Sequence, residues 1–198
     1  IKVNSPFRSD FDFGDLLMDG IEQIEIIRGA QSALYGSEAI GGVIDLKTRS
    51  GKAAREFSIK SEIGNNETFR ETLRMQGKDD RTDYSFSASR VDTEGELKRD
   101  SFHGMTFVGK LGYSPTAESD LRLTTLYNRS KKELGTDVDE FKIPVKVISD
   151  ENNLAKRDLI LSSIAADLKP VKWFQMSVKG SILDSDLVID NPIDPGAV

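Results

Sequence analysis

The stretch IEQIEIIRGAQSALYGSEAIGGVIDLKTRSG, residues 21–51, consists of short apolar runs separated by glycines. The β-branched isoleucines within residues 21–27 predict a strand that ends at an Arg-Gly pair. Residues 31–35 can form one helical turn, which Gly36 stops. Residues 43–48 predict a second strand. The stretch therefore indicates a small, turn-rich unit in which two strands flank one turn of helix.

The pattern changes after this stretch. From about residue 54, segments of ten or more residues alternate apolar and polar side chains, which is the period of a strand with two different faces. In the first of them, Phe57, Ile59 and Ile63 share one face. We predict seven such strands, although Glu71 lies on an apolar face and the sixth segment alternates less cleanly. The segments cover residues 56–63, 69–76, 83–89, 105–113, 121–127, 156–169 and 173–182.

The lengths of these segments and of their connections favour a membrane β-barrel. Soluble strands usually have about five or six residues, whereas a tilted strand needs about 9 to 11 residues to cross a bilayer. Outer-membrane barrels alternate short periplasmic turns with longer extracellular loops. The expected long connections are residues 93–100 and 131–155, and the other four are short. We therefore expect the long connections to face outward.

A soluble β-sandwich is the alternative, because its strands also alternate and its loops also vary in length. The polar faces carry rows of Lys, Arg and Glu, which suit a wet barrel interior. The apolar faces end in Tyr, Phe or Trp, which suit the interfaces of a membrane. These two features favour the barrel.

The composition excludes several classes of protein. The 198 residues include 27 Lys and Arg against 33 Asp and Glu, a net charge of -6 with no basic stripe, so we expect no nucleic-acid partner. No apolar run approaches the roughly 18 to 20 residues of a membrane-spanning helix. The chain has no cysteine, which excludes disulfides and thiolate metal sites. It begins at Ile1 rather than Met, and we expect it to be cut at both ends.

Catalytic motifs are weak in this sequence. The glycine-rich residues 36–42 lack the Lys and the Ser or Thr of a phosphate-binding loop, so we expect no nucleotide site. His103 is the only histidine. Its neighbour Ser101 keeps an outer-membrane enzyme as an alternative, but we expect the protein not to be an enzyme.

One acidic cluster could bind a metal. Asp137, Asp139 and Glu140 lie in the longest connection, and closely spaced carboxylates supply oxygen ligands to calcium. Their spacing does not match an EF-hand, and a solvated surface cluster is the alternative. The sequence predicts no definite cofactor. Calcium bound in this outward loop is the candidate.

Residues 21–51 resemble the end of the plug domain of TonB-dependent receptors, in which a strand, Arg-Gly, a helical turn, Tyr-Gly and a Gly-Gly strand follow in that order. Gln23 and Ala30 depart from the residues common in the family. The resemblance implies an all-β protein with a small α+β plug portion. Residues 1–51 would be the C-terminal part of the plug, and residues 52–198 the first seven or so strands of a transmembrane antiparallel barrel of about 22 strands. The shared positions are Glu25, Arg28, Gly29, Ser32, Ala33, Tyr35, Gly36, Ala39, Ile40, Gly41, Gly42 and Thr48.

The resemblance also implies a function. It is strongest to the cobalamin and catecholate-siderophore branch, which implies energy-coupled uptake of cobalamin or a ferric siderophore across the outer membrane of a Gram-negative bacterium. The expected partners are the metal chelate, outer-membrane lipid and TonB, whose contact segment is not in this chain. A signalling or docking receptor of the same fold is the first alternative, and an outer-membrane enzyme the second.

Roles for single residues follow from the same resemblance. Phe7, Arg8 and Ser9 lie where the family builds the plug apex, so they are candidate ligand contacts, with a plain connecting loop as the alternative. We expect Glu25 and Arg28 to hold the plug against the inner barrel wall through charge-assisted hydrogen bonds. Gly29, Tyr35, Gly36, Gly41 and Gly42 are expected to serve the plug's backbone geometry and packing.

Overall fold

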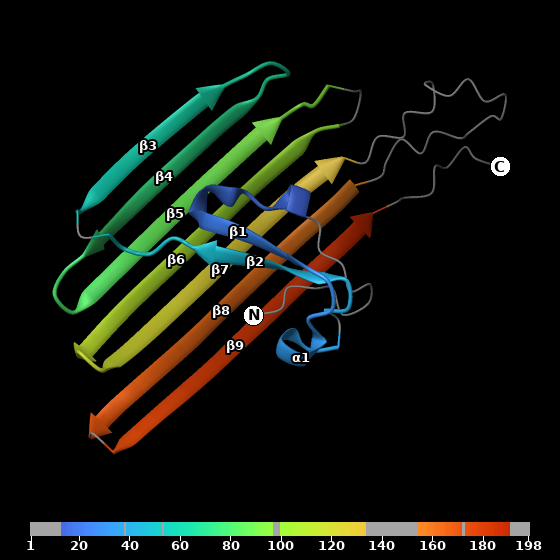
Figure 1. Cartoon of the computed structure of the whole chain (residues 1–198). Helices are drawn as coiled ribbons and strands as arrows, with labels where there is room; N and C mark the ends of the chain where they lie inside the picture. Colours follow the sequence, from blue (N-terminus) through green and yellow to red (C-terminus); the bar gives the residue numbers. More distant parts are fainter. Residues whose placement is uncertain are drawn as a thin grey trace.

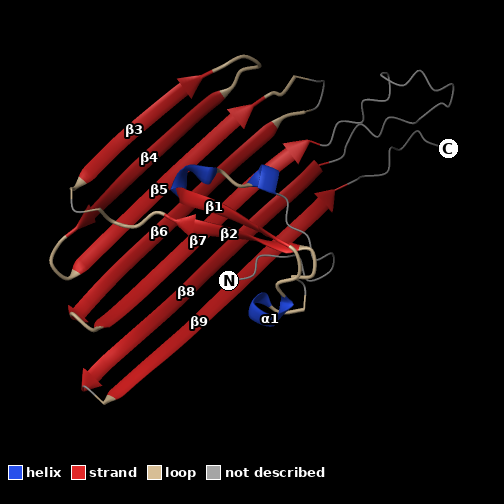
Figure 2. Cartoon of the chain, viewed as in Figure 1, coloured by secondary structure: helices blue, strands red, loops and turns tan. Residues whose placement is uncertain are grey.

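The computed structural model describes residues 13–37, 39–52, 54–96, 100–133, 154–171 and 173–190. They form two antiparallel sheets, one of two strands and one of seven (Figure 1). Helix is confined to short turns, as Figure 2 shows. No helix among these residues is long and apolar enough to cross a membrane.

The small sheet belongs to an N-terminal unit, which we define as residues 13–50. Its order is strand, helical turn, strand, as the sequence predicts. Backbone hydrogen bonds close the connection between the two strands, including one of 2.8 Å from the Gln31 amide to the Ala39 carbonyl. The elements are η1 (Phe13–Asp15), η2 (Met18–Gly20), β1 (Ile21–Arg28), α1 (Ser32–Tyr35) and β2 (Gly42–Thr48).

The large sheet follows in simple up-and-down order. Each strand pairs with its neighbours in the sequence, from β3 at one edge to β9 at the other. The seven strands predicted from the alternation are confirmed. Within the described residues the sheet is open, since β3 and β9 do not pair. The strands are β3 (Glu56–Ile63), β4 (Phe69–Lys78), β5 (Thr82–Thr93), β6 (Phe102–Thr116), β7 (Ser119–Glu133), β8 (Leu154–Val171) and β9 (Phe174–Asp190).

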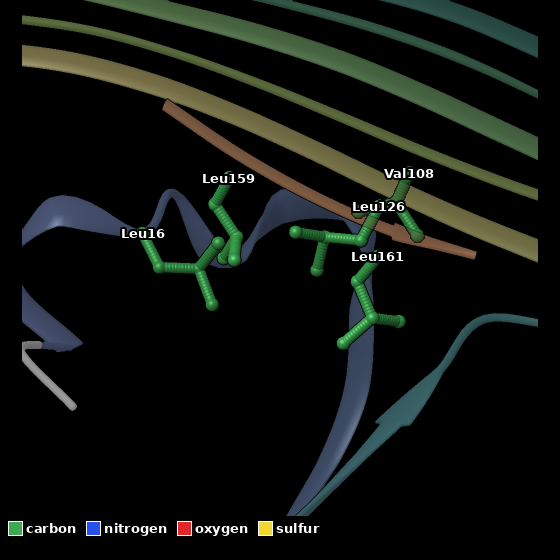
Figure 3. Packing of buried hydrophobic residues seen from close by; sticks show 5 residues of the cluster. All are labelled: Leu16, Val108, Leu126, Leu159 and Leu161. Carbon is green, nitrogen blue, oxygen red and sulfur yellow. The ribbon is translucent and has the colours of Figure 1, made fainter. Parts of the chain in front are cut away.

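The N-terminal unit lies across one face of the large sheet (Figure 1). We call this face the inner face and the opposite one the outer face. The element η2 contacts β5 and β6, and η1 contacts β7. A small apolar cluster lies between the unit and the sheet (Figure 3). Met18 and Leu46 pack against it. The buried members of the cluster are Leu16, Val108, Leu126, Leu159 and Leu161.

The two faces of the sheet differ in chemistry. Away from the apolar cluster, the covered inner face is built of small polar side chains. The outer face carries large apolar side chains such as Leu73, Phe107 and Leu123, each more than a third exposed. In the described part of the chain no second sheet packs against this apolar face, so the sandwich alternative is wrong. The buried polar side chains of the inner face are Thr72, Ser85, Ser87, Ser89, Thr106, Asn128 and Ser130.

Strand β8 shows why its sequence alternates less cleanly. Leu159 and Leu161 point to the inner face and are buried in the cluster, whereas Ile160 and Ile164 lie on the outer face and are exposed. Both faces are therefore apolar over this stretch. The inner face is therefore apolar at the cluster, to which the N-terminal unit contributes Leu16.

Candidate functional site

Asp15 anchors one end of the N-terminal unit to the sheet. Its carboxylate is buried and lies 3.1 Å from the Lys132 ammonium of β7 and 3.4 Å from the Arg157 guanidinium of β8. The Asn128 amide donates a 2.8 Å hydrogen bond to the Asp15 carbonyl. A buried carboxylate is tolerated only when it is paired and hydrogen-bonded. The contact therefore ties η1 to two neighbouring strands.

Asp19 makes a second anchor on β4. Its two carboxylate oxygens accept hydrogen bonds from Arg70 at 2.6 Å and from Arg74 at 3.0 Å. Burial acts to raise the pKa of Asp19, but the hydrogen bonds from Arg70 and Ser89 and the two positive charges outweigh it and hold the pKa below its ordinary value of 3.8. Asp19 is therefore ionised at neutral pH, and the pair of guanidinium groups holds it in place.

Between the two anchors the chain lies directly on the inner face. The Leu17 amide donates to the Thr106 hydroxyl at 3.2 Å, and the Asn128 amide donates to the same hydroxyl at 2.9 Å. A Cβ at Gly20 would lie 2.5 Å from the Cβ of Val108. Any larger residue at position 20 would therefore separate the unit from the sheet.

A third contact lies just before the chain enters the large sheet. The ammonium of Lys110 on β6 donates a 2.8 Å hydrogen bond to the hydroxyl of Ser50. The N-terminal unit is thus held at both of its ends, by Asp15 and Asp19 at the start and by Ser50 at the finish.

Glu25 and Arg28 make no hydrogen bond or ion pair with the large sheet among the described residues. Glu25 forms a 3.0 Å ion pair with Lys47 on β2, inside the N-terminal unit, and this contact raises the pKa of Lys47. Arg28 is exposed and makes no ion pair with the described residues. The predicted wall contacts of Glu25 and Arg28 stay predictions, and the anchors on the described sheet are Asp15 and Asp19.

Three glycines of the N-terminal unit have backbone conformations that side chains rarely adopt, and the first of them is Gly29, with φ of 91°. Gly36 ends α1 with φ of 89°, next to the half-exposed Tyr35. Gly42 has φ of 149°, and a Cβ there would lie 2.5 Å from the Ile27 carbonyl oxygen. The Gly29 amide donates to the Gly41 carbonyl at 3.2 Å. Open space surrounds the position of a Cβ at Gly41, so its predicted structural role stays a prediction.

The predicted ligand and metal residues lie outside the described residues. This holds for Phe7, Arg8 and Ser9 and for Asp137, Asp139 and Glu140. Their roles stay predictions. In the part of the chain that the structure describes, no group of three or more His, Asp and Glu side chains is placed to hold a metal ion.

Aromatic side chains on the outer face support a membrane setting. The rings of Tyr84, Phe86 and Phe107 stack in a row across β5 and β6, with centroids 6.2 and 6.4 Å apart. Trp173 and Phe174 lie edge to face at the turn between β8 and β9. The first three rings lie within the apolar band, whereas Trp173 and Phe174 lie at the ends of two strands, where aromatic girdles border the apolar band of outer-membrane barrels.

An antiparallel sheet that is apolar outside, and that holds a folded unit by ion pairs inside, is the architecture of a barrel wall with part of an internal plug. The model of the TonB-dependent Receptor Plug Domain family matches residues 1–43. Residues 1–43 of this chain are thus similar to the plug domain of the TonB-dependent receptors. From here on we call the N-terminal unit the plug unit and the large sheet the wall.

Known proteins with similar sequence and structure agree with this assignment. The vitamin B12 transporter BtuB of Vibrio vulnificus is 34% identical over 96 residues, which cover 48% of this chain and 16% of that protein. The siderophore receptor PiuA of Acinetobacter baumannii has a TM-score of 0.68 at 16% identity, covering 88% of this chain and 28% of PiuA. The ferric-catecholate import receptor Fiu of E. coli K12 has a TM-score of 0.66 at 13% identity, covering 87% and 30%. The chain thus spans less than a third of each of these proteins.

Proposed function

We propose that these residues are part of a receptor that imports a scarce metal complex across the outer membrane of a Gram-negative bacterium, with energy delivered through TonB. The observation that carries the proposal is the anchored plug unit. Asp15 and Asp19 fix it to the inner face of the wall, while the opposite face exposes apolar side chains to the surroundings.

The substrate class follows from the relatives. One sequence relative is a vitamin B12 transporter, and two similar structures are siderophore receptors, so the candidates are cobalamin and ferric siderophores. Both are chelates too large for general pores. Binding would fall to the plug apex and the outward loops, which include the predicted contacts Phe7, Arg8 and Ser9.

The anchors suit a plug that is held at rest and moved on demand. Each anchor is a set of ion pairs that breaks without chemical change and can form again. The cations of both anchors stand on wall strands, so they keep their positions when the plug unit moves. Uptake would follow from displacement of the unit, and no covalent step is required of this chain.

Catalysis is not part of this proposal. His103 bonds through Nδ1 to Asp92 at 2.9 Å on the outer face of the wall, which we assign to the membrane side. Among the described residues no serine hydroxyl lies within hydrogen-bond distance of His103. We therefore propose binding and transport as the whole role of the protein.

Uptake by the full-length receptor tests the function. The gene would be expressed in a Gram-negative host that lacks its own cobalamin and catecholate receptors, and uptake of labelled cobalamin and of ferric catecholates would be measured with and without TonB. We expect TonB-dependent uptake of one of the two, and calorimetry should show its binding to the purified receptor. Uptake of neither would contradict the proposed substrate class.

A tether between plug and wall tests the mechanism. Because the chain has no native cysteine, Ser50→Cys and Lys110→Cys can be bridged by a short bifunctional thiol reagent. We expect the bridged receptor to bind its chelate but not import it. Each single cysteine variant, treated with the same reagent, is the control and should import normally. Full uptake by the bridged receptor would show that this part of the plug does not move.

A further inference from the structure

Two pairs of consecutive basic residues divide their charges between the two faces of the wall. They are Lys131 and Lys132 on β7 and Lys156 and Arg157 on β8. Lys132 and Arg157 point inward to Asp15. Since side chains alternate along a strand, Lys131 and Lys156 lie on the outer face, and both are exposed. The contact with Asp15 therefore explains the presence of Lys132 and Arg157 but not that of Lys131 and Lys156.

The register places these lysines directly opposite each other. Lys131 pairs with Lys156 on one side and with His103 of β6 on the other. Like charges that face each other across a strand pair destabilise a sheet. Within the described residues neither lysine forms an ion pair. Two ammonium groups thus face each other across the strand pair, beside the His103 ring, which bonds to Asp92.

Two neighbouring carboxylates, Asp92 and Asp158, are engaged elsewhere, and Glu133 and Asp190 lie in the next row of the outer face, beyond the lysines. Asp92 accepts from Arg90 at 2.6 Å and from His103 at 2.9 Å. Asp158 lies 3.5 Å from Arg129. Glu71 of β4 and Asp186 of β9 lie on the outer face in the row of Arg129, so acidic residues border the basic patch on both sides. The patch is therefore narrow and centred on Lys131 and Lys156.

The position of the patch along the strands matches the edge of the membrane. Lys131 lies four residues beyond Tyr127, which pairs with Phe107 and Ile160 at the end of the apolar band. A rise of about 3.4 Å per residue on a strand tilted by about 45° puts the Lys131 backbone roughly 10 Å above Tyr127. The headgroup layer is about 5 to 8 Å thick. A flexible lysine can reach back into that layer with its ammonium group.

We infer that Lys131 and Lys156, with Arg129 and His103 beside them, bind the phosphate of a phosphorylated lipid headgroup in the outer leaflet. Phosphate oxygens accept charge-assisted hydrogen bonds from both ammonium groups and remove the repulsion between them. The inference rests on the proposed orientation, in which this end of the wall faces outward. It adds a lipid site on the outside of the receptor to the chelate site at its centre.

Lipid retention by the full-length receptor tests the inference. Wild-type receptor and the K131Q/K156Q variant would be titrated with diphosphorylated lipid A in micelles, and bound lipid would be counted by native mass spectrometry. We expect about 25-fold weaker binding by the variant, since each lysine contributes roughly fivefold at a negatively charged surface. The control K60Q/K179Q removes two charges from the inner face and should bind lipid like the wild type. Heat-modifiable migration on gels verifies that every variant is folded.

Three results would overturn the inference. The first is equal binding by wild type and K131Q/K156Q, which would mean that another group neutralises the lysines. The second is equal binding of lipid A that lacks phosphate. The third is displacement of the lipid by millimolar inorganic phosphate, which would assign the patch to free phosphate. Chelate uptake is measured separately, so a receptor that binds this lipid but imports neither chelate would contradict the proposed function alone.

Discussion

Alternating residues of β7 and β8 form the inner and the outer face of the wall, yet the two faces make different kinds of contact. On the inner face, Leu159 is buried in the cluster and Arg157 pairs with Asp15. On the outer face, the neighbouring Ile160 and Lys156 are exposed. The inner face is specific to one partner, the plug unit. The outer face fits any surroundings of the right polarity, which is what a lipid bilayer offers.

This difference can be measured as the free energy of plug release. Ser87 is 3% exposed beneath the plug unit, so a Ser87→Cys substitution gives a thiol that reacts only when the inner face is uncovered. The urea dependence of its labelling, in a full-length receptor otherwise free of cysteine, reports the release. Substitutions on the inner face should change this free energy, and those on the outer face should not.

The largest effect is expected at the cluster. Leu159→Ala should lower the free energy of plug release by about 4 kcal/mol. The Leu159 side chain is only 2% exposed, so its truncation leaves a cavity beside Leu16. Ile160→Ala, one residue away on the outer face, is the control and should change it by less than about 0.5 kcal/mol. Equal effects of the two substitutions would contradict the assignment of the faces.

The next effect is expected at the first anchor. Asp15→Asn should lower the free energy of plug release by about 3 kcal/mol, because it leaves the charges of Lys132 and Arg157 without this carboxylate. The same labelling measures it. Glu25→Gln is the matched control and should have little effect, since its partner Lys47 belongs to the plug unit itself. A larger effect at Glu25 would restore the wall contact expected from the sequence.

A charge on the outer face should affect assembly in the membrane rather than plug release. Leu123→Arg places a guanidinium in the middle of the apolar band and should destabilise the receptor by about 2 kcal/mol in refolding titrations into lipid vesicles. Gln76→Arg on the inner face can pair with Glu56, which Gln76 already contacts at 2.7 Å, and should be tolerated. Equal tolerance of both arginines would argue against lipid contact at Leu123.

The smallest effect is expected with pH. The pKa of Asp19 lies below its ordinary value of 3.8, so its contribution to plug retention is present above about pH 4 and is lost as the pH falls through the lowered pKa. The difference in release free energy between wild type and Asp19→Asn should therefore shrink on acidification below pH 4. A difference that stays constant from pH 7 to pH 3 would show that the Asp19 charge does not hold the plug.

The alternation of side chains predicted most of the fold. It gave all seven strands of the wall, because one polar and one apolar face leave a period of two in the sequence. It also marked Glu71 as an exception, and the structure pairs this residue with Arg90 beyond the apolar band. Alternation could not predict that Leu159 and Leu161 face inward, because that depends on where the plug unit covers the wall.

The anchors of the site were missed for a related reason. Asp15 and Asp19 lie in a short segment without periodicity, and nothing local distinguishes them from solvated carboxylates. The basic partners of Asp19, however, did carry a sequence signal for an anchor. Arg70 and Arg74 share the polar face of one strand, and two guanidinium groups directed into a barrel need an anion between them. Pairing across fifty residues follows from three-dimensional placement, which a single sequence does not contain.

The order of the two anchors along the chain has a mechanical consequence. Asp15 and Asp19 are separated by a short stretch, and each grips different strands of the wall. A force applied to the chain ahead of Asp15 loads that carboxylate first and reaches Asp19 only after the first has yielded. The bonds then fail in series, as in peeling, so the peak force is set by one anchor instead of the sum of both. A modest pull could thus free a plug that thermal motion leaves in place.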